Sequence, residues 1–314
     1  MIETHSDILA IHPGALGDCI LLGRVLGELG CEGEVAFVGH ASINRLLAGL
    51  GVVQKTLDFD LLPMHELFTD ALIEAGPLAR QLGACDRLIS MYGEGNPAAE
   101  QRLIRACGAK TATFLPIRPP AGYAGHLTEH WLAKLASPLR RSDLCARAWP
   151  VPTAWREAGL CRLREAGVVD KKYIVLHPGA GGVQKRWPME KFVEVAQAIQ
   201  TQLDKLPVFV LGPVECEIFT KSELHVLQTF PAMHCPSLEE FAGLLAGAEA
   251  MVGNDSGPAH LAASVGIKTV CIFCTMPAVH FSPLGPAVTV LRASSVPELV
   301  ADDIIRAILI GNVR

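Results

Sequence analysis

The chain has 314 residues, of which 50% are hydrophobic and 19% are charged, and its formal net charge is -5 at pH 7. This length suits two α/β domains of about 150 residues each better than one domain. The small negative charge excludes a general electrostatic attraction to nucleic acid or to an anionic membrane. The amino terminus lacks the basic and long apolar segments of a signal peptide, and no apolar run approaches the roughly eighteen residues that span a bilayer. We therefore expect a cytoplasmic protein.

In the first half, short apolar segments alternate with longer amphipathic ones, which predicts a parallel sheet built from βαβ units. The expected strands are residues 8–11, 35–38 and 88–91, and the expected helices are residues 19–29 and 71–82. Prolines and arginines interrupt the pattern between residues 138 and 155, as expected of a linker between domains.

The same alternation begins again in the second half. The expected strands are residues 173–176, 208–211, 250–252 and 269–273, and the expected helices are 189–203, 238–246, 258–265 and 297–310. We therefore predict a Rossmann-like amino-terminal domain over 1–150 and a second Rossmann-like domain over 151–296. The last helix, in 297–314, is expected to pack back toward the amino-terminal domain.

A short duplication supports two related domains. Residues 8–17, ILAIHPGALG, resemble residues 174–182, IVLHPGAGG, and each copy joins a predicted strand to a predicted helix. Glycine at such a turn allows backbone amides at the start of the helix to approach an anion closely. We therefore expect both turns to take part in ligand binding.

Three motifs carry candidate chemistry, and the first follows the opening strand. Asp18 comes directly after Gly14 and Gly17, where the first helix is expected to begin. Aspartate is a favoured N-cap residue, so its carboxylate is expected to accept hydrogen bonds from the first helical turn. A spare carboxylate oxygen in the same place can also remove a proton from a substrate hydroxyl. The sequence alone favours the cap, and the two roles are compatible.

The second motif is the segment 179–188, GAGGVQKRWP. Gly179, Gly181 and Gly182 precede Lys185 and Arg186, and a helix is expected to follow Pro188. Glycines beside an ammonium and a guanidinium suit a diphosphate, although a solvated basic loop is the plainer interpretation. The density of glycine and positive charge favours phosphate binding.

The third motif is the segment 253–260, GNDSGPAH, between a predicted strand and a predicted helix. Asp255 or Ser256 can cap the helix, and Pro258 suits its first turn. The amides of Ser256 and Gly257 would then face an anion at the positive end of the helix. His260, taken alone, is more typical of a buried structural histidine than of a ligand contact.

Ten cysteines are scattered through apolar segments, with one C-x-x-C pair at Cys271 and Cys274. A zinc site usually needs a second such pair, so these residues are expected to act as small hydrophobic side chains in a strand. No metal is expected.

Taken together and in this order, the three motifs resemble those of the glycosyltransferase family 9 heptosyltransferases, over residues 8–285. The resemblance implies a GT-B fold, in which two Rossmann-like domains have parallel sheets facing a central cleft. It implies inverting, metal-independent transfer of heptose from ADP-heptose to a lipopolysaccharide core acceptor, without a cofactor. The acceptor is a membrane-anchored glycan, so the resemblance also implies peripheral contact with the cytoplasmic face of the inner membrane.

The resemblance assigns roles to individual residues of this chain. Asp18 matches the catalytic base, and Lys185 matches the lysine that neutralises the donor diphosphate. Glu215, with Glu217 as the fallback, matches the acid that contacts the donor ribose. The remaining donor-side matches are Gly179, Gly181, Gly182, Asp255, Ser256, Gly257 and His260. On the acceptor side the candidates are His12, Gly14 and Gly17, and His12 departs from the family by standing near a position that is often basic.

Three other functions were weighed against this one. A nicotinamide-dependent oxidoreductase needs G-x-G-x-x-G and an acid after the second strand, whereas this chain has Gly-x-x-Gly and Gly39-His40 there. A sugar-nucleotide epimerase of the same architecture remains open, because epimerases differ in needing no acceptor. A protein that binds nucleotide sugar without turnover is also open, although it would not require both Asp18 and Lys185.

Overall fold

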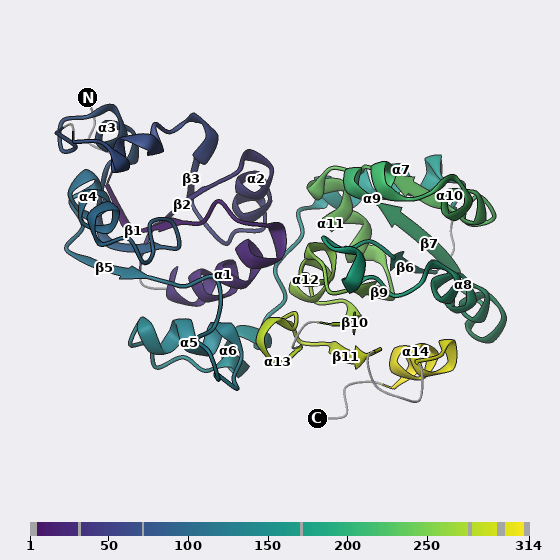
Figure 1. Ribbon diagram of the computed structural model, residues 1–314. Helices are drawn as coiled ribbons and strands as arrows, with labels where there is room; N and C mark the ends of the chain where they lie inside the picture. Colours follow the sequence, from purple (N-terminus) through teal and green to yellow (C-terminus); the bar gives the residue numbers. More distant parts are fainter. Residues whose placement is uncertain are drawn as a thin grey trace. The chain divides into compact units, whose positions relative to one another are not determined.

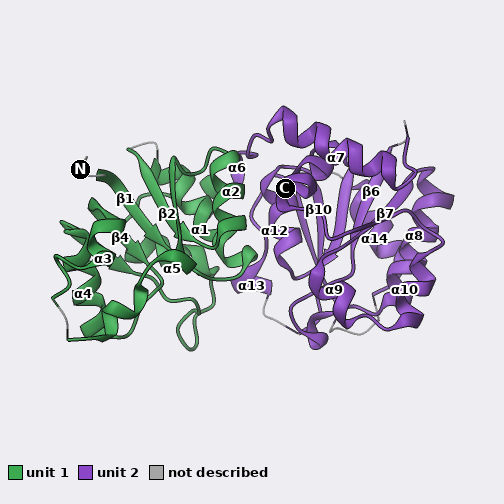
Figure 2. Cartoon of the chain, turned by 90° about the horizontal axis from the view of Figure 1, so that it is seen from above, with its two compact units in different colours: residues 1–144 green, residues 145–314 purple. Residues whose placement is uncertain are grey.

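The computed structural model describes residues 5–30, 33–70, 72–169, 172–275, 278–293 and 299–310. The chain divides into two compact units, residues 1–144 and 145–314 (Figure 2). This division lies close to the expected boundary at residue 150. Each unit contains a parallel sheet with helices, as Figure 1 shows, so the α/β fold class predicted from the sequence is confirmed.

Unit 1 is built on a five-stranded sheet with the order β3-β2-β1-β4-β5, all neighbours being parallel. Its strands are β1 (His5–Ile11), β2 (Val35–Gly39), β3 (Lys55–Asp58), β4 (Ala84–Ser90) and β5 (Thr111–Phe114). Its helices are α1 (Leu16–Leu29), α2 (Ala41–Gly49), α3 (Pro77–Leu82), α4 (Pro97–Cys107), α5 (Leu127–Lys134) and α6 (Arg141–Ala146), the last running into unit 2. The central strand β1 is buried over its apolar end, which packs beside β2 and β4.

Two edge strands of unit 1 were missed by the sequence analysis. β3 reads Lys-Thr-Leu-Asp and β5 reads Thr-Ala-Thr-Phe, and neither contains a fully buried residue. An edge strand has one neighbour and little need of an apolar run, so its pattern is weak. The predicted helix over 71–82 was also too long, because α3 begins only at Pro77. The residue before a proline is disfavoured in helical conformation, and Ala71 lies outside the described residues.

Unit 2 is built on a six-stranded parallel sheet with the order β11-β10-β9-β6-β7-β8. Its strands are β6 (Tyr173–His177), β7 (Leu206–Leu211), β8 (Ala232–His234), β9 (Ala250–Asn254), β10 (Lys268–Phe273) and β11 (Val288–Arg292). Its helices are α7 (Thr153–Glu165), α8 (Met189–Leu203), α9 (Pro213–Ile218), α10 (Lys221–Leu227), α11 (Leu238–Gly247), α12 (Gly257–Ser264), α13 (Ala278–Phe281) and α14 (Ala301–Leu309). The four strands predicted from the second half are all present. The edge strands β8 and β11 were not predicted.

The terminal helix α14 packs within unit 2, against α8 and β10. Its apolar residues Ile304, Ile305 and Ile308 belong to the same core cluster as Phe192 of α8 and Ile272 of β10. The apolar stripe of this helix is therefore covered by unit 2. The expected linker over 138–155 is also partly helical, since it contains α6 and the start of α7.

Alternate residues of β10 point to opposite faces of the sheet. Ile272 joins the core cluster beneath α8 and α14, whereas Cys271 packs with Ala259 of α12. Cys274 contacts the first of these clusters, so the two cysteines of the C-x-x-C pair pack into different cores. Within the described residues, no group of histidine, cysteine, aspartate and glutamate side chains is arranged to hold a metal ion.

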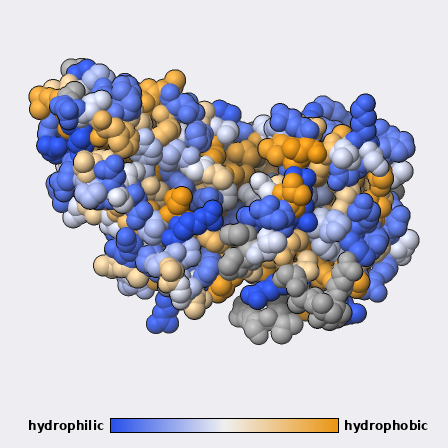
Figure 3. All heavy atoms as spheres, viewed as in Figure 1, coloured by the Kyte–Doolittle hydropathy of each residue, from blue (hydrophilic) through white to orange (hydrophobic). Residues whose placement is uncertain are grey.

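Hydrophilic and hydrophobic residues are interspersed on the face shown in Figure 3. Large apolar side chains that remain exposed include Leu61, Phe68 and Leu72, around the short helical turns after β3. In the described part of the chain, no helix is both long enough and apolar enough to cross a membrane.

Helices α7 and α11 cross at two glycines. A Cβ atom on Gly243 would overlap the carbonyl group of Trp155, and one on Gly159 would overlap the backbone at Leu244. Backbone is the obstacle in both cases, so no side-chain rotation relieves the overlap. The two helices approach this closely only because both positions lack a side chain.

We predict that Gly243→Ala lowers the free energy of unfolding by about 1–3 kcal/mol, because an extra methyl group overpacks this crossing. Urea denaturation of the intact chain measures the change. Gly181→Ala is the matched control, because a Cβ atom there meets nothing within 4 Å and the residue does not need a positive φ. Equal stability of the two variants would contradict the proposed crossing.

Candidate functional site

Both sheets have the doubly wound strand order, in which the connections leave the two central strands in opposite directions. Ligands of such folds bind beyond the carboxyl ends of the strands at this switch point. The switch point lies between β1 and β4 in unit 1 and between β6 and β9 in unit 2. The predicted site residues follow β1, β6, β7 and β9, so both units hold candidates at the expected edge.

In unit 2, the side chain of Asn254 connects the loops at this edge. Asn254 ends β9 and is fully buried. Its Nδ2 donates to the carbonyl oxygen of Pro178 at 2.8 Å, and its Oδ1 accepts from the amide of Trp187 at 3.1 Å. One carboxamide therefore holds the beginning and the end of the glycine-rich loop that follows β6. The sequence motif GNDSGPAH contains Asn254 but does not by itself predict this role.

Lys185 and Asp255 form an ion pair at the same edge. Lys185 ends the 3-10 turn η4 (Val183–Lys185), and its Nζ lies 2.8 Å from Oδ2 of Asp255. The carboxylate is 7% exposed and the lysine side chain 29% exposed. The backbone amide of Asp255 also donates to the carbonyl oxygen of Ile272 at 3.0 Å. The structure thus brings the second and third sequence motifs into direct contact.

Helix α12 begins beside this ion pair. Ser256 occupies the N-cap position, but its hydroxyl donates to the carbonyl oxygen of Asn254 at 3.1 Å and makes no capping hydrogen bond. Asp255 does not cap the helix either, because its carboxylate is bound to Lys185. The prediction of a side-chain cap at Asp255 or Ser256 was therefore wrong. Pro258 has no N–H, and the amide of Ala259 donates to the carbonyl oxygen of Ser256 at 3.0 Å. The amides of Ser256 and Gly257 come before this hydrogen bond, so the start of α12 is a positive end suited to an anion.

The carboxylate of Glu215 lies over the glycine-rich loop. Its Oε2 accepts from the amide of Gly212, the N-cap residue of α9, at 2.8 Å. A Cβ atom on Gly179 would overlap the same carboxylate, so a larger residue there would force the Glu215 side chain to move. Glu217, the fallback candidate, is exposed two residues further along α9. Gly181 and Gly182 follow in the loop, where they meet no backbone obstacle.

Two buried histidines flank this arrangement. Nδ1 of His177 is hydrogen-bonded to the carbonyl oxygen of Val210 at 2.9 Å, and its Nε2 lies 4.0 Å from Oε1 of Glu215. Because a carbonyl oxygen only accepts, Nδ1 of His177 carries the proton. His260 is 4% exposed, and its Nδ1 has no hydrogen-bond partner within the described residues. Burial and the nearby charge of Lys185 lower the pKa of His260 to about 4, so its imidazole is neutral at pH 7.

In unit 1, Asp18 lies in the first turn of α1. The N-cap residue is Ala15, which has no capping side chain, so Asp18 is the third residue of the helix and is half-buried. Asp18 is therefore not the N-cap residue, which lies three positions earlier, at Ala15. A carboxylate in the first turn is still favoured by the positive end of the helix. Gly17 is the residue before it, within the same turn.

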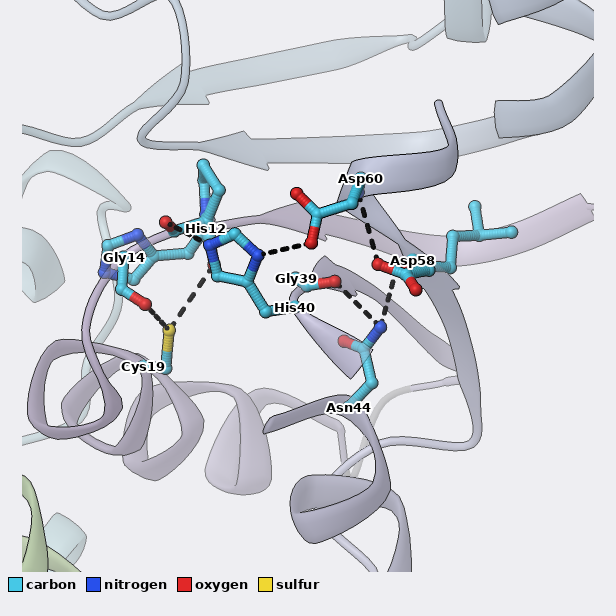
Figure 4. A network of polar contacts seen from close by, with 10 residues as sticks. His12, Gly14, Cys19, Gly39, His40, Asn44, Asp58 and Asp60 are labelled. Atoms are coloured by element: carbon cyan, nitrogen blue, oxygen red, sulfur yellow. Dashed lines mark hydrogen bonds and ion pairs between the residues drawn. The ribbon is translucent and has the colours of Figure 1, made fainter. Parts of the chain in front are cut away.

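The loop before Asp18 is held around His12. The His12 side chain is 3% exposed, and a Cβ atom on Gly14 would overlap its imidazole. The Cys19 thiol lies 3.4 Å from the carbonyl oxygens of both His12 and Gly14 (Figure 4). Burial lowers the pKa of His12 to about 4, and its Nε2 has no partner in the described part of the chain. His12 is therefore a neutral packing residue at pH 7 and does not supply a positive charge.

A second histidine supports this loop from β2, and the sequence analysis missed its role. Nε2 of His40 lies 3.1 Å from the carbonyl oxygen of Pro13, and Nδ1 lies 2.9 Å from Oδ2 of Asp60 (Figure 4). Both partners are acceptors, so both ring nitrogens donate in the protonated imidazole. The hydrogen bond with Asp60 raises the pKa of His40 above its usual value. Asp60 follows β3, so failing to predict this strand also hid the pair.

The model of glycosyltransferase family 9 (heptosyltransferase) matches residues 143–306, which is more than half of the chain. This chain belongs to glycosyltransferase family 9. The match includes the glycine-rich loop, Lys185, Glu215 and the start of α12. A search of curated protein sequences finds no match.

Solved structures agree with this family fold. A family 9 glycosyl transferase from Veillonella parvula is 17% identical, with a TM-score of 0.72 over 98% of this chain and 97% of its own. The E. coli ADP-heptose lps heptosyltransferase II is 17% identical, with a TM-score of 0.67 over 96% and 97% of the two chains. The E. coli heptosyltransferase WaaC with ADP is 16% identical, with a TM-score of 0.65 over 96% and 98%. At these identities the likeness establishes the fold, and enzyme activity as a glycosyltransferase follows from membership of the family.

We predict that acid destabilises this family 9 protein through His12 and His260. The pKa of each is lowered from 6.5 to about 4 in the folded chain, so the unfolded chain binds more protons as the pH falls. Stability is therefore retained above pH 6.5 and lost between about pH 6.5 and pH 4, by about 3 kcal/mol for each histidine. Urea denaturation at several pH values measures this slope.

The variants His12→Asn and His260→Asn should each flatten the decline toward acid, whatever their stability at pH 7. His65→Asn is the control, because His65 is exposed and its replacement should leave the slope unchanged. Parallel profiles for the variants and the unsubstituted protein would rule out this origin of the acid sensitivity.

Proposed function

We propose that this family 9 enzyme is an inverting, metal-independent transferase that moves heptose from ADP-heptose to a lipopolysaccharide core acceptor. The observation that carries the proposal is the ion pair of Lys185 and Asp255 beside the start of α12. A movable cation next to a helix amino terminus is suited to a diphosphate. The family model, described as heptosyltransferase, supports the choice of sugar.

On the donor side, Lys185 would leave Asp255 wholly or partly to contact the diphosphate. The amides of Ser256 and Gly257 would bind the same phosphates, aided by the positive end of α12. Glu215 would accept hydrogen bonds from the ribose hydroxyls with its Oε1, because its Oε2 is already bound to Gly212. Gly179, Gly181 and Gly182 would allow the backbone to approach the nucleotide, and the neutral imidazole of His260 would stay beside the phosphates.

In the transfer step, Asp18 would remove the proton of an acceptor hydroxyl as its oxygen attacks the anomeric carbon. The bond from that carbon to the ADP oxygen breaks on the opposite face, which inverts the configuration. ADP leaves with the electron pair, and Lys185 and the amides of α12 stabilise its developing charge. A carboxylate is a weak base, so its contribution depends on positioning and on a late proton transfer.

On the acceptor side, Gly14 and Gly17 would allow a sugar to approach Asp18. His12 keeps Gly14 in place by packing against it, and His40 supports the same loop through Pro13. The acceptor would be a lipid-linked glycan reached at the cytoplasmic face of the inner membrane. No cofactor would be needed besides the nucleotide-sugar donor, and no nucleic acid would take part.

The donor is tested by thermal unfolding in the presence of ADP, ADP-heptose, UDP and NAD. ADP and ADP-heptose should stabilise the protein by about 2.7 kcal/mol at a hundredfold excess over Kd, and UDP and NAD should not. Lys185→Ala should weaken the stabilisation by ADP, whereas Lys191→Ala, in α8, should not, because the Lys191 ammonium pairs with Glu194 of the same helix. Equal stabilisation by UDP would exclude an ADP-specific donor site.

The base is tested with Asp18→Asn, which keeps the size of the side chain and removes its basicity. Acceptor-dependent release of ADP should fall by about 10²-fold or more, while the Kd for ADP is unchanged. Glu28→Gln makes the same change at the far end of α1 and should retain activity. Near-normal turnover by Asp18→Asn would refute the assignment. Isomerisation of the sugar nucleotide without acceptor would indicate an epimerase, and ADP binding without acceptor-dependent release would indicate a binding protein.

A further inference from the structure

Two cysteines meet at the carboxyl edge of the sheet in unit 2. Cys216 lies in α9 and Cys235 directly follows β8, and their Sγ atoms are 3.6 Å apart. The backbone places them there, because the amide of Cys235 donates to the carbonyl oxygen of Leu211 at 2.7 Å and that of Cys216 to Gly212 at 3.1 Å. Two consecutive carbonyl groups at the end of β7 therefore anchor the two thiols side by side.

The two thiols differ in their surroundings. Cys235 is exposed and has a φ of 46°, a left-handed conformation that is uncommon for residues other than glycine. Cys216 is half-buried, and burial together with Cys235 raises the pKa of its thiol to about 11. Its Sγ also lies 3.8 Å from Nδ1 of His234. An accessible thiol thus stands next to a more sheltered one.

Other cysteines of the described chain lack this combination. Cys85 and Cys107 also interact, but both are buried in the core of unit 1, where a dissolved oxidant does not reach them. Cys161 is exposed on α7, and its thiol lies 3.9 Å from a carboxylate oxygen of Glu165. At Cys216 and Cys235, two thiols lie close to each other and one of them is exposed to solvent.

We propose that Cys216 and Cys235 are a redox-active dithiol that closes to a reversible disulfide between α9 and the end of β8. The oxidant is a small-molecule disulfide. The Cys235 thiolate attacks one of its sulfurs, forming a mixed disulfide and releasing one thiolate. The deprotonated thiol of Cys216 then attacks the sulfur of Cys235, which forms the protein disulfide and releases the second thiol. The protein loses two hydrogens, and the oxidant is reduced to two thiols.

Closure would act on the neighbouring donor residue, a consequence that rests on the proposed function. Glu215 directly precedes Cys216, and its carboxylate packs against Gly179 with no space for a methyl group between them. A disulfide bond requires the sulfurs to approach from 3.6 Å to about 2.05 Å, and we expect the start of α9 to move toward β8 as they do. We expect this movement to disturb the contact of Glu215 with the nucleotide and to weaken ADP binding about tenfold.

The pair is tested on the intact chain, equilibrated in mixtures of reduced and oxidised glutathione and then alkylated. Peptide mass spectrometry should find a peptide that links Cys216 to Cys235 and disappears with dithiothreitol. Cys235→Ser should abolish this species and leave Cys216 free, and Cys161→Ser should not affect it. Thiols that stay fully alkylated across the series, or that only form mixed disulfides with glutathione, would overturn the proposal.

The effect on the donor is measured separately, by calorimetric titration of ADP into the reduced and the oxidised protein. A loss of affinity on oxidation that Cys235→Ser prevents would support the coupling to Glu215. An unchanged Kd in a protein that carries the disulfide would refute that coupling. If even the reduced protein does not bind ADP, the proposed function fails, and the mass measurement still decides whether the dithiol is present.

Discussion

The loops at the carboxyl edge of the sheet in unit 2 depend on one buried carboxamide. Asn254 has both a donor and an acceptor on a short side chain, and it uses them on two different backbone groups of the same loop. An aspartate would lose the donor, and a leucine would leave both backbone groups without a partner. A buried polar group without a hydrogen bond costs about 1–3 kcal/mol. The carboxamide thereby fixes where the loop starts and where it ends, and Lys185 is two residues before the end. The ion pair with Asp255 follows from this constraint, because Asp255 is the residue after Asn254.

The two units use the same short motif in different ways. Each has His-Pro-Gly-Ala where its first strand ends, and in each the histidine is buried and the glycine lies beneath a side chain. In unit 1 the covering group is the imidazole of His12 itself, and in unit 2 it is the carboxylate of Glu215, which arrives from α9. The backbone of the turn is thus reused, while the polar group above it differs. The turn before Asp18 is therefore covered by a neutral imidazole, whereas the turn before Lys185 is covered by a carboxylate.

The sequence was most informative where buried strands meet glycine-rich loops. The strands β1, β6 and β9 contain short buried apolar runs, so the sequence predicted that the segments after them, with Asp18, Lys185 and Asp255, lie at the sheet edge. Prediction failed where a residue acts through a distant backbone group. Asn254 acts through one carbonyl group and one amide group that lie about seventy residues before it in the sequence. His40 acts through the carbonyl group of Pro13 and through Asp60, which follows an edge strand without an apolar pattern. Cys216 lies in α9 and Cys235 directly follows β8, and neither element was predicted. Asp18 was assigned to the N-cap because the helix begins earlier than its apolar stripe, at Leu16.

The packing of α7 against α11 at two glycines has a consequence for the folding of unit 2 during synthesis. Helix α7 is the first element of that unit to be synthesised, and its partner α11 follows roughly eighty residues later. Until then α7 must remain in water without its covering helix. Its composition suits this delay, because its only buried residues are Gly159 and Leu163 and its other positions are largely charged or small. A more apolar α7 would stabilise the packing of α7 against α11 in the folded unit. It would also expose an aggregation-prone apolar surface on every nascent chain.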